Sequence, residues 1–408
     1  NMKNILVHLI FLILSLIPLN SYAQGISYES FGKGIKVQAK DSSFYGKLGF
    51  RFQSLFSSSL NLENDVWNRS MMIRRSRLKA EGWALSPKFS YKVELALSNR
   101  DIKGGSKTEF GNTANIILDA VLKYHINSNW SLWFGQTKLP GNRERVFSSQ
   151  KLQFVDRSLV NARFNLDRDV GLQLHHKSNI GNLVVKEAFS LSLGNGRNVI
   201  INDENGYQYT GRIEFLPMGE FAGKGDYYGA DLAREKTLKM AIGITADYNN
   251  NAFRSRGNLG SFLVDPVSED YITDNLNTLF VDAIVKKNGF SSQAVYAIRN
   301  STNSQGDFGL GQGLNLQAGY VFANNVEFAA RFTNINAEVT STLNNETEYA
   351  FGFSKYFSTY RLPSPNAFSA SILADWNSLV NETALCAILI PRPPPPDTAL
   401  IITGKPIF

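Results

Sequence analysis

The stretch Phe44-Tyr-Gly-Lys-Leu-Gly-Phe-Arg-Phe-Gln53 alternates apolar and polar side chains. In an extended chain Leu48 and Phe50 lie on one face, and Lys47 and Arg51 lie on the other, because successive strand residues point to opposite sides. Comparable stretches recur along the sequence and predict an all-β fold of about sixteen strands. The predicted strands start near residues 44, 69, 88, 115, 129, 168, 181, 205, 237, 276, 290, 312, 325, 346, 368 and 398.

The composition excludes several classes of protein. The 408 residues include 42 Lys and Arg against 35 Asp and Glu, and 43% are hydrophobic. A disordered chain would be poorer in apolar residues and more highly charged. The single cysteine excludes a disulfide framework and a cysteine-ligated metal site. A mean hydropathy of −0.18 excludes a bundle of membrane helices. It leaves open a transmembrane barrel, whose strands hide their apolar residues by alternation.

The N-terminus is typical of a signal peptide. Lys3 precedes the apolar stretch 5–19, and Ser21-Tyr-Ala23 offers a small-x-small cleavage site. A short transmembrane anchor is the alternative, but the apolar core is shorter than the roughly 18–20 residues that span a bilayer. We therefore expect a cleaved signal peptide at 1–23, followed by an N-terminal periplasmic lead-in at 24–43.

Short and long connections alternate along the predicted strands. Tight turns fall at positions such as Asn127–Asn129 and Asn288-Gly289, and a long loop covers 138–167. Short turns at one end and long loops at the other are typical of an up-and-down antiparallel β-barrel in the outer membrane. We predict such a barrel over 44–380, although the connections 216–236 and 358–367 are longer than this pattern requires. A secreted or surface β-rich adhesion or structural protein is the alternative, because alternation alone does not say which face meets water.

Basic residues are concentrated in the first third of the chain and in the loop at 138–167, which is long enough to fold into a pore and narrow it. A fixed positive field attracts anions, and guanidinium groups can hold phosphate oxygens two at a time. The same cations could instead bind lipopolysaccharide or pair with nearby acids. The candidate anion-binding residues are Lys47, Arg51, Arg74, Arg75, Arg77, Lys79, Lys138, Arg143, Arg145, Lys151, Arg157, Arg163 and Arg168.

Two segments resemble a known family. The run Gly135-Gln-Thr-Lys-Leu-Pro-Gly-Asn-Arg-Glu-Arg145, followed by Phe154-Val-Asp-Arg-Ser-Leu159 and Arg168-Asp-Val-Gly171, resembles the third loop of the phosphate-selective porin O and P family. Met72-Ile-Arg-Arg-Ser-Arg-Leu78 resembles that family's second strand. The resemblance covers about 44–215, and the later strands follow it by pattern only.

The resemblance implies a homotrimeric channel in the outer membrane of a Gram-negative bacterium, in contact with lipid and lipopolysaccharide. Such a channel would pass small anions, phosphate or polyphosphate foremost, with no catalysis, cofactor, metal or nucleic acid. The resemblance assigns contact with the anion to Arg74, Arg75 and the third-loop cations, and more remotely to Lys47 and Arg51. A general or sugar-passing porin is the alternative within the same class.

The C-terminal segment 381–408 departs from the strand pattern. Cys386-Ala-Ile-Leu-Ile-Pro-Arg-Pro-Pro-Pro-Pro396 is rich in proline, which cannot donate a hydrogen bond to a sheet. The segment 398–408 is a candidate closing strand, and a frameshifted or divergent tail is the alternative explanation. His175 and His176 are adjacent, so they point to opposite faces of a strand and cannot share a metal. We therefore expect no enzymatic site.

Overall fold

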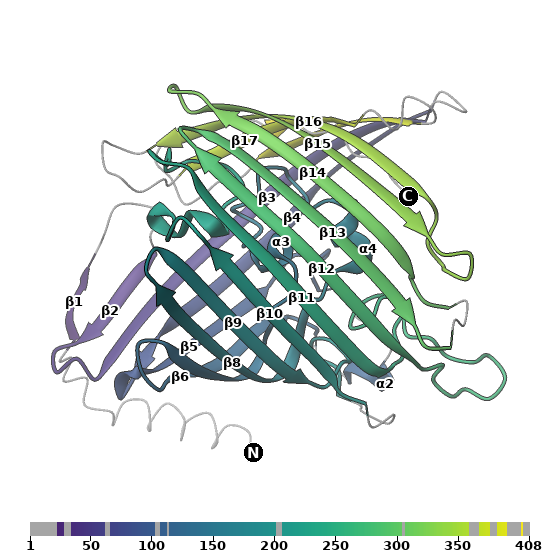
Figure 1. Ribbon diagram of the computed structural model, residues 1–408, viewed down its shortest axis with the longest axis horizontal. Coiled ribbons are helices and arrows are strands. Elements are labelled where there is room, and N and C mark those ends of the chain that lie inside the picture. The colour runs from purple at the N-terminus through teal and green to yellow at the C-terminus, as the bar shows by residue number, and fades with distance from the viewer. Residues whose placement is uncertain are drawn as a thin grey trace, which may run out of the picture.

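The computed structural model describes residues 23–27, 34–61, 66–102, 107–111, 114–200, 206–303, 307–358, 367–375, 382–389 and 401–402. All its named strands belong to one antiparallel sheet, which curves around an interior (Figure 1). The strands are β1 (Ala23–Ser27), β2 (Ile35–Ala39), β3 (Phe44–Asn61), β4 (Val66–Ala84), β5 (Ser86–Ala96), β6 (Ile117–His125), β7 (Trp130–Lys138), β8 (Arg168–Ile180), β9 (Leu183–Ser192), β10 (Gln208–Leu216), β11 (Lys239–Ala252), β12 (Asp274–Lys287), β13 (Phe290–Ser301), β14 (Gly311–Val321), β15 (Val326–Ala337), β16 (Glu346–Ser358), β17 (Ala367–Asp375), β18 (Glu382–Leu389) and β19 (Ile401–Ile402).

The order of the strands follows the chain. Each strand from β3 to β17 pairs with the next one, and their starts lie within a few residues of those predicted from the sequence. β18 pairs with residues 54–61 of β3, while β2 pairs with residues 45–48 of the same strand. β3 therefore has β4 along one side, and β18 and β2 in succession along the other. The prediction of an all-β, up-and-down antiparallel barrel is confirmed.

The turns at one end of the sheet are short for a local reason. Asn288 and Gly289, which connect β12 to β13, have φ angles of 50° and 92°. Positive φ at both central residues is the requirement of the two-residue turn that matches the twist of a hairpin, and Asn-Gly meets it at little steric cost. The predicted tight turn thus fixes the register of two long neighbouring strands.

The two faces of the sheet have the polarity of a membrane barrel. On β12 the outward Leu279 and Val281 are 40% and 41% exposed, whereas Thr278 and Asp282, which alternate with them, are buried. A soluble protein would have the opposite arrangement, with apolar side chains inside. The outward apolar face suits lipid and argues against the secreted β protein that the sequence left open. No helix in the described ranges is long and apolar enough to cross a membrane.

The long loop after β7 folds into the interior, as predicted. It contains α3 (Arg143–Val146) and α4 (Leu159–Phe164), which Figure 1 shows behind the front strands β11–β14. Val160 and Phe164 of α4 pack against Phe280 of β12 and neighbouring inward side chains in one apolar cluster. A further short helix, α2 (Lys107–Phe110), lies in the loop after β5. The interior is therefore partly filled by a packed loop.

A second segment also enters the interior. The connection between β10 and β11, which the sequence marked as unexpectedly long, contains the 3-10 helix η1 (Ala222–Tyr227). Phe221 is buried with Phe147 of the long loop and Ile284 of β12. The long loop and the connection 217–238 therefore meet inside the barrel.

The chain ends differ in part from expectation. Residues 1–22 of the predicted signal peptide lie outside the described residues. The predicted lead-in at 24–43 contains strand β2 and most of β1. β18, which precedes the prolines, pairs with residues 54–61 of β3, and it contains no proline, so every backbone N–H in it can join the ladder. Of the candidate closing strand 398–408, Ile401–Ile402 forms β19 and pairs with β18, and the remaining residues lie outside the described residues.

The polarity of the sheet predicts the effect of a charge on its outer face. Phe134, near the middle of β7, is 61% exposed. We expect Phe134→Arg to lower the free energy of unfolding in lipid vesicles by about 2–4 kcal/mol, because arginine must be desolvated by lipid. The matched control is Ser131→Arg on the same strand, since Ser131 faces the interior cavity. Equal losses of stability in the two variants would contradict the assignment of faces.

Candidate functional site

The interior contains a cavity of about 1000 Å³. Its wall comes from the inward faces of β3–β10, from the long loop and from the connection 217–238. Lysine and arginine predominate over acids in this wall. The basic residues are Lys47, Arg51, Arg77, Lys79, Lys92, Lys123, Lys138, Lys151, Arg168, Lys177, Lys186, Arg212 and Lys224, and the acidic ones are Glu81, Glu94, Glu187 and Glu214.

Some cavity cations share a carboxylate. Lys47 and Lys79 both lie against Glu81, and the Lys47 Nζ is 3.7 Å from its carboxylate. These side chains remain about one-third exposed to solvent, so the pairs are weak and exchangeable. Lys92 is paired more closely than Lys47: its Nζ lies 3.1 Å from the Glu94 carboxylate and 2.6 Å from that of the buried Asp119.

Besides Lys138, three cavity lysines have no carboxylate within ion-pair distance in the part of the chain that the structure describes. The Lys123 Nζ lies 3.4 Å from the centre of the Trp133 ring, and the Lys151 Nζ lies 3.9 Å from that of Tyr228. Lys224 lies in η1. A ring face attracts a cation without neutralising it. Their positive charge is therefore available to a solute.

The predicted third-loop cations are mostly paired. Arg143 is 1% exposed, and its guanidinium contacts Asp282 at 2.9 Å and Glu214 at 3.2 Å. Arg212 contacts the same two carboxylates at 2.7 and 2.6 Å. Two cations and two anions thus balance each other where α3 meets the wall. Arg163 forms a two-point contact with Glu346 of β16, with both distances 2.7 Å.

Two other predicted cations hold backbone carbonyls. The Lys138 ammonium donates to the carbonyl oxygens of Arg145, Val146 and Phe147 at 2.9, 3.0 and 2.8 Å. These are orphan acceptors at the end of α3, so Lys138 caps that helix. Arg157 donates to the carbonyls of Glu144 and Phe147 at 2.7 and 2.8 Å. Burial, reinforced by the charge of Arg145, lowers the pKa of Arg157 well below its usual range.

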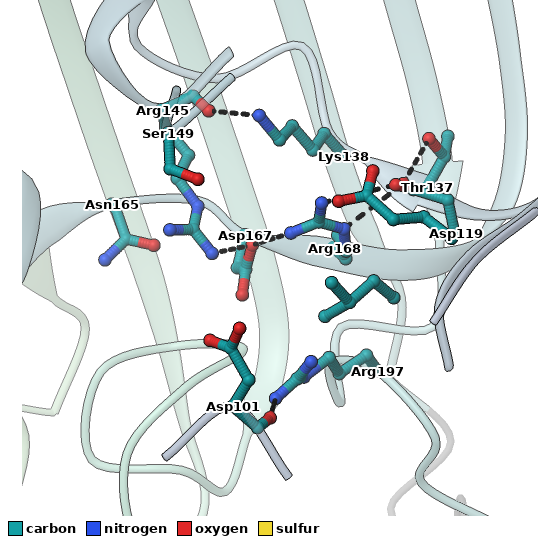
Figure 2. Close-up of polar contacts among 12 residues, drawn as sticks. Asp101, Asp119, Thr137, Lys138, Arg145, Ser149, Asn165, Asp167, Arg168 and Arg197 are labelled. Carbon is teal, nitrogen blue, oxygen red and sulfur yellow. Dashed lines mark hydrogen bonds and ion pairs between the residues drawn. The ribbon is translucent and has the colours of Figure 1, made fainter. Parts of the chain in front are cut away.

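Figure 2 shows the charge cluster where the long loop rejoins the wall. Arg168 contacts Asp119 at 3.1 Å and Asp167 at 3.4 Å, and Asp167 also pairs with Arg145. Burial alone would raise the pKa of Asp167, but the charges of Arg145 and Arg168 hold it well below its usual range. The Thr137 hydroxyl donates to Asp119 at 3.0 Å. This cluster fixes both ends of the loop.

The arginines of β4 are also paired with carboxylates. Arg74 and Arg75 both contact Asp156 of the long loop, at 2.9 and 2.8 Å. Arg77, two residues further along, contacts Glu94 at 3.2 Å and Asp101 at 3.1 Å. Arg51 of β3 donates to the Ser149 hydroxyl at 2.9 Å.

The structure divides the sequence-predicted residues into two groups. Lys47, Arg51, Arg77, Lys79, Lys138, Lys151 and Arg168 line the cavity, whereas the cavity wall does not include Arg74, Arg75, Arg143, Arg145, Arg157 and Arg163. The sequence analysis did not single out Lys92, Lys123, Lys177, Lys186, Arg212 and Lys224, which do line it. For Lys92 and Lys123, alternation with apolar neighbours was the available signal.

The histidines act as parts of the wall. His175 stacks on Trp133 with ring centres 3.9 Å apart, and His176 stacks on Trp130 at 4.1 Å. Trp130 and Trp133 are three residues apart on β7, so their side chains point to opposite faces of the sheet. This agrees with the expectation that the two histidines point to opposite faces. No cluster of three or more His, Cys, Asp or Glu side chains that could hold a metal occurs within the described ranges.

The ion pairs of the loop predict unequal contributions to stability. We expect Arg143→Met to lower the free energy of unfolding by about 3–5 kcal/mol, because it leaves buried carboxylates short of a partner. Arg163→Met removes a pair whose side chains are 25% and 21% exposed, and we expect a loss of about 1 kcal/mol or less. Urea unfolding in vesicles measures both. A larger loss for Arg163→Met would contradict the ranking.

Comparison with family models gives one match. The family model of the phosphate-selective porins O and P matches residues 47–324. Comparison with curated sequences gives no match.

Three solved structures illustrate the structural likeness. OmpT of Vibrio cholerae, folded in vitro and in its trimer form, is 11% identical with a TM-score of 0.47, covering 88% of this chain and 95% of that one. The high-pH structure of Pseudomonas putida OprB is 10% identical with a TM-score of 0.48, covering 84% and 93%. The anion-selective porin of Comamonas acidovorans is 8% identical with a TM-score of 0.44, covering 88% and 96%. The family match spans most of the chain, and the protein therefore belongs to the phosphate-selective porin O and P family of outer-membrane porins.

Proposed function

We propose that this porin passes small anions by passive diffusion, with phosphate-type anions foremost. The observation that carries the proposal is the excess of lysine and arginine over glutamate in the cavity wall. Positively charged side chains clustered in a narrow cavity with low-dielectric walls raise the local concentration of mobile anions and repel mobile cations. Transport of this kind needs no bond to be made or broken, so the proposal requires no catalytic group.

The free lysines support this proposal better than the arginines do. Lys123, Lys151 and Lys224 carry charges that no described carboxylate neutralises, whereas most predicted arginines are committed to carboxylates or carbonyls. Efficient conduction needs several sites of moderate affinity, because a single tight site would hold the ion. A flexible, strongly hydrated ammonium exchanges partners readily, unlike a two-point guanidinium contact.

We further propose that the porin assembles as a homotrimer and contacts lipid and lipopolysaccharide at its outer face. Membership of the porin O and P family and the apolar outer face support this proposal. Chemical cross-linking of the protein in native membranes tests it, with trimers expected as the largest discrete product. Monomers alone at every cross-linker concentration would contradict it.

The reversal potential under a potassium chloride gradient tests the anion preference. We expect the purified protein in a planar bilayer to favour chloride over potassium. Changing Lys123, Lys151 and Lys224 together to Gln should lower the permeability ratio about tenfold, equivalent to about 1.4 kcal/mol of lost attraction. The matched control replaces Lys88, Lys236 and Lys287, which are exposed and outside the cavity wall, with Gln.

The same measurement distinguishes the alternative. A general or sugar-passing porin would give a reversal potential near zero and similar ratios in both triple variants. Anion preference without block of the chloride current by phosphate would indicate a general anion porin. Unchanged selectivity in the cavity variant would reject the lysines as its source.

A further inference from the structure

The loop between β11 and β12, residues 253–273, has a defined shape of its own. An isolated backbone bridge pairs Arg254 with Phe262 within the loop. Three of its rings form a cluster, in which the centre of the Phe253 ring lies 5.8 Å from that of Phe262 and 4.9 Å from that of Tyr271. Backbone pairing and ring packing within one loop hold its parts together, so we treat residues 253–273 as one body.

This body reaches inward over the barrel opening. The Arg256 Nη1 donates to the carbonyl of Ala162 in α4 at 2.7 Å, and the Asn258 amide oxygen accepts from the backbone N–H of Asp167 at 3.3 Å. Both partners belong to the long loop, which lies inside the barrel. The long connections of an outer-membrane barrel stand at its extracellular end. Residues 253–273 therefore cover part of the long loop on the side from which solutes enter.

One attachment of this body to the rim is firm. The backbone N–H of Gly309 donates to the carbonyl of Ser255 at 2.7 Å. Phe308 and Leu310 are fully buried, and Leu263 packs against the apolar cluster that contains them. Gly309 and its neighbours belong to the connection between β13 and β14. The body is thus joined to the neighbouring part of the rim by a backbone hydrogen bond and by buried apolar side chains.

The attachment to α2 is made by side chains. The Phe110 ring meets the Phe262 ring edge to face, with centres 5.6 Å apart, and the Tyr271 hydroxyl donates to the Glu109 carboxylate at 3.2 Å. α2 follows β5, and the strands β6–β10 separate β5 from β11 along the sheet. This contact therefore joins distant parts of the rim. A ring pair and a side-chain hydrogen bond exchange more readily than the buried attachment beside β13.

We propose that residues 253–273 form a lid, and that Phe110, Phe262 and Tyr271 latch this lid across the extracellular opening. The latched lid sets the upper size limit for solutes that enter the channel. This inference rests on the proposed channel function and deepens it, because it adds a limit on size to the preference for charge. When the latch opens, the attachment beside β13 acts as the hinge. Small anions pass the latched lid, and bulkier solutes pass only when it is open.

The test is the swelling of proteoliposomes in neutral sugars, with the rate in raffinose, a trisaccharide, compared with the rate in glucose. Phe110→Ser combined with Tyr271→Phe removes the latch and leaves the rings of Phe253 and Phe262 in place. We expect the ratio of the two rates to rise about two- to tenfold, which is the shift in an opening equilibrium that loss of one aromatic pair produces. The matched control is Val267→Ser, because Val267 is on the same loop but 91% exposed and outside the latch.

A reversible variant separates the latch from general damage to the fold. Phe110→Cys and Phe262→Cys, in a Cys386→Ser background, remove both rings and supply thiols for a short bifunctional cross-linker. Without the cross-linker this protein should show the raised ratio, and cross-linking should restore the ratio of the unaltered protein. Heat-modifiable migration shows that each variant has folded.

Each outcome decides the proposal. A raised ratio in the latch variant, reversed by the cross-linker in the cysteine variant, supports it. An unchanged ratio in the latch variant, an equal rise in Val267→Ser or a raised ratio that persists after cross-linking would overturn it. The reversal potential of the unaltered protein under a potassium chloride gradient is recorded separately. Its lack of anion preference would reject the proposed function and leave the lid standing, because the swelling assay uses uncharged solutes.

Discussion

The ion pair between Arg143 and Asp282 fixes the long loop inside the barrel, and the shape of the interior depends on it. Arg143 stands at the first position of α3, and Asp282 is an inward residue of β12, which lies four strands along the sheet from β8. The side chain and the backbone N–H of Arg143 both donate to the Asp282 carboxylate, at 2.9 and 3.1 Å. Moving a buried cation away from two carboxylates costs much free energy, because it leaves buried charges without partners. The rest of the loop packs around this fixed point.

The second inserted segment is tied to the same point. The carbonyl of Asp226 accepts from Arg143 at 3.2 Å, and its carboxylate pairs with Lys186 of β9 at 2.6 Å. The Lys286 ammonium of β12 donates to the carbonyls of Gly225 and Ala230 at 2.9 and 2.7 Å. The connection 217–238 is therefore part of the interior, although the sequence showed only that it is longer than a tight turn. The cavity is bounded by two inserted segments, and their lysines and tyrosines face it together.

Much of the fold could be predicted from the sequence because alternation is a local property. A residue such as Leu279 reveals its face through its immediate neighbours, and Asn288-Gly289 specifies its own turn. The strand β18 was missed because its eight residues precede a proline run that dominates the composition of the tail. The faces themselves were left open, since alternation is the same for lipid outside and for a core inside. Exposure of the apolar face in the folded sheet decided between them.

The candidate site was less predictable because ion pairing depends on residues distant in sequence. Arg163 is neutralised by Glu346 and Arg143 by Asp282, and no local pattern announces either partner. Clusters in sequence, such as Arg74-Arg75, drew attention to cations that prove to be paired. The free lysines are single inward residues such as Lys123 on β6 and Lys151 in the loop, which become a cluster only in the folded barrel.

This division between arginine and lysine has a physical basis. Guanidinium groups are weakly hydrated and form two-point contacts, so they suit buried positions where a loop must be held to a wall. Ammonium groups keep their hydration and move on flexible stems, so they suit a solvent-filled cavity whose occupants must exchange. Arg74 and Arg75 of β4 illustrate the first use, because both contact Asp156 of the long loop and hold that loop to the wall. In this barrel, therefore, the placement of the acids determines which cations keep an uncompensated charge in the cavity.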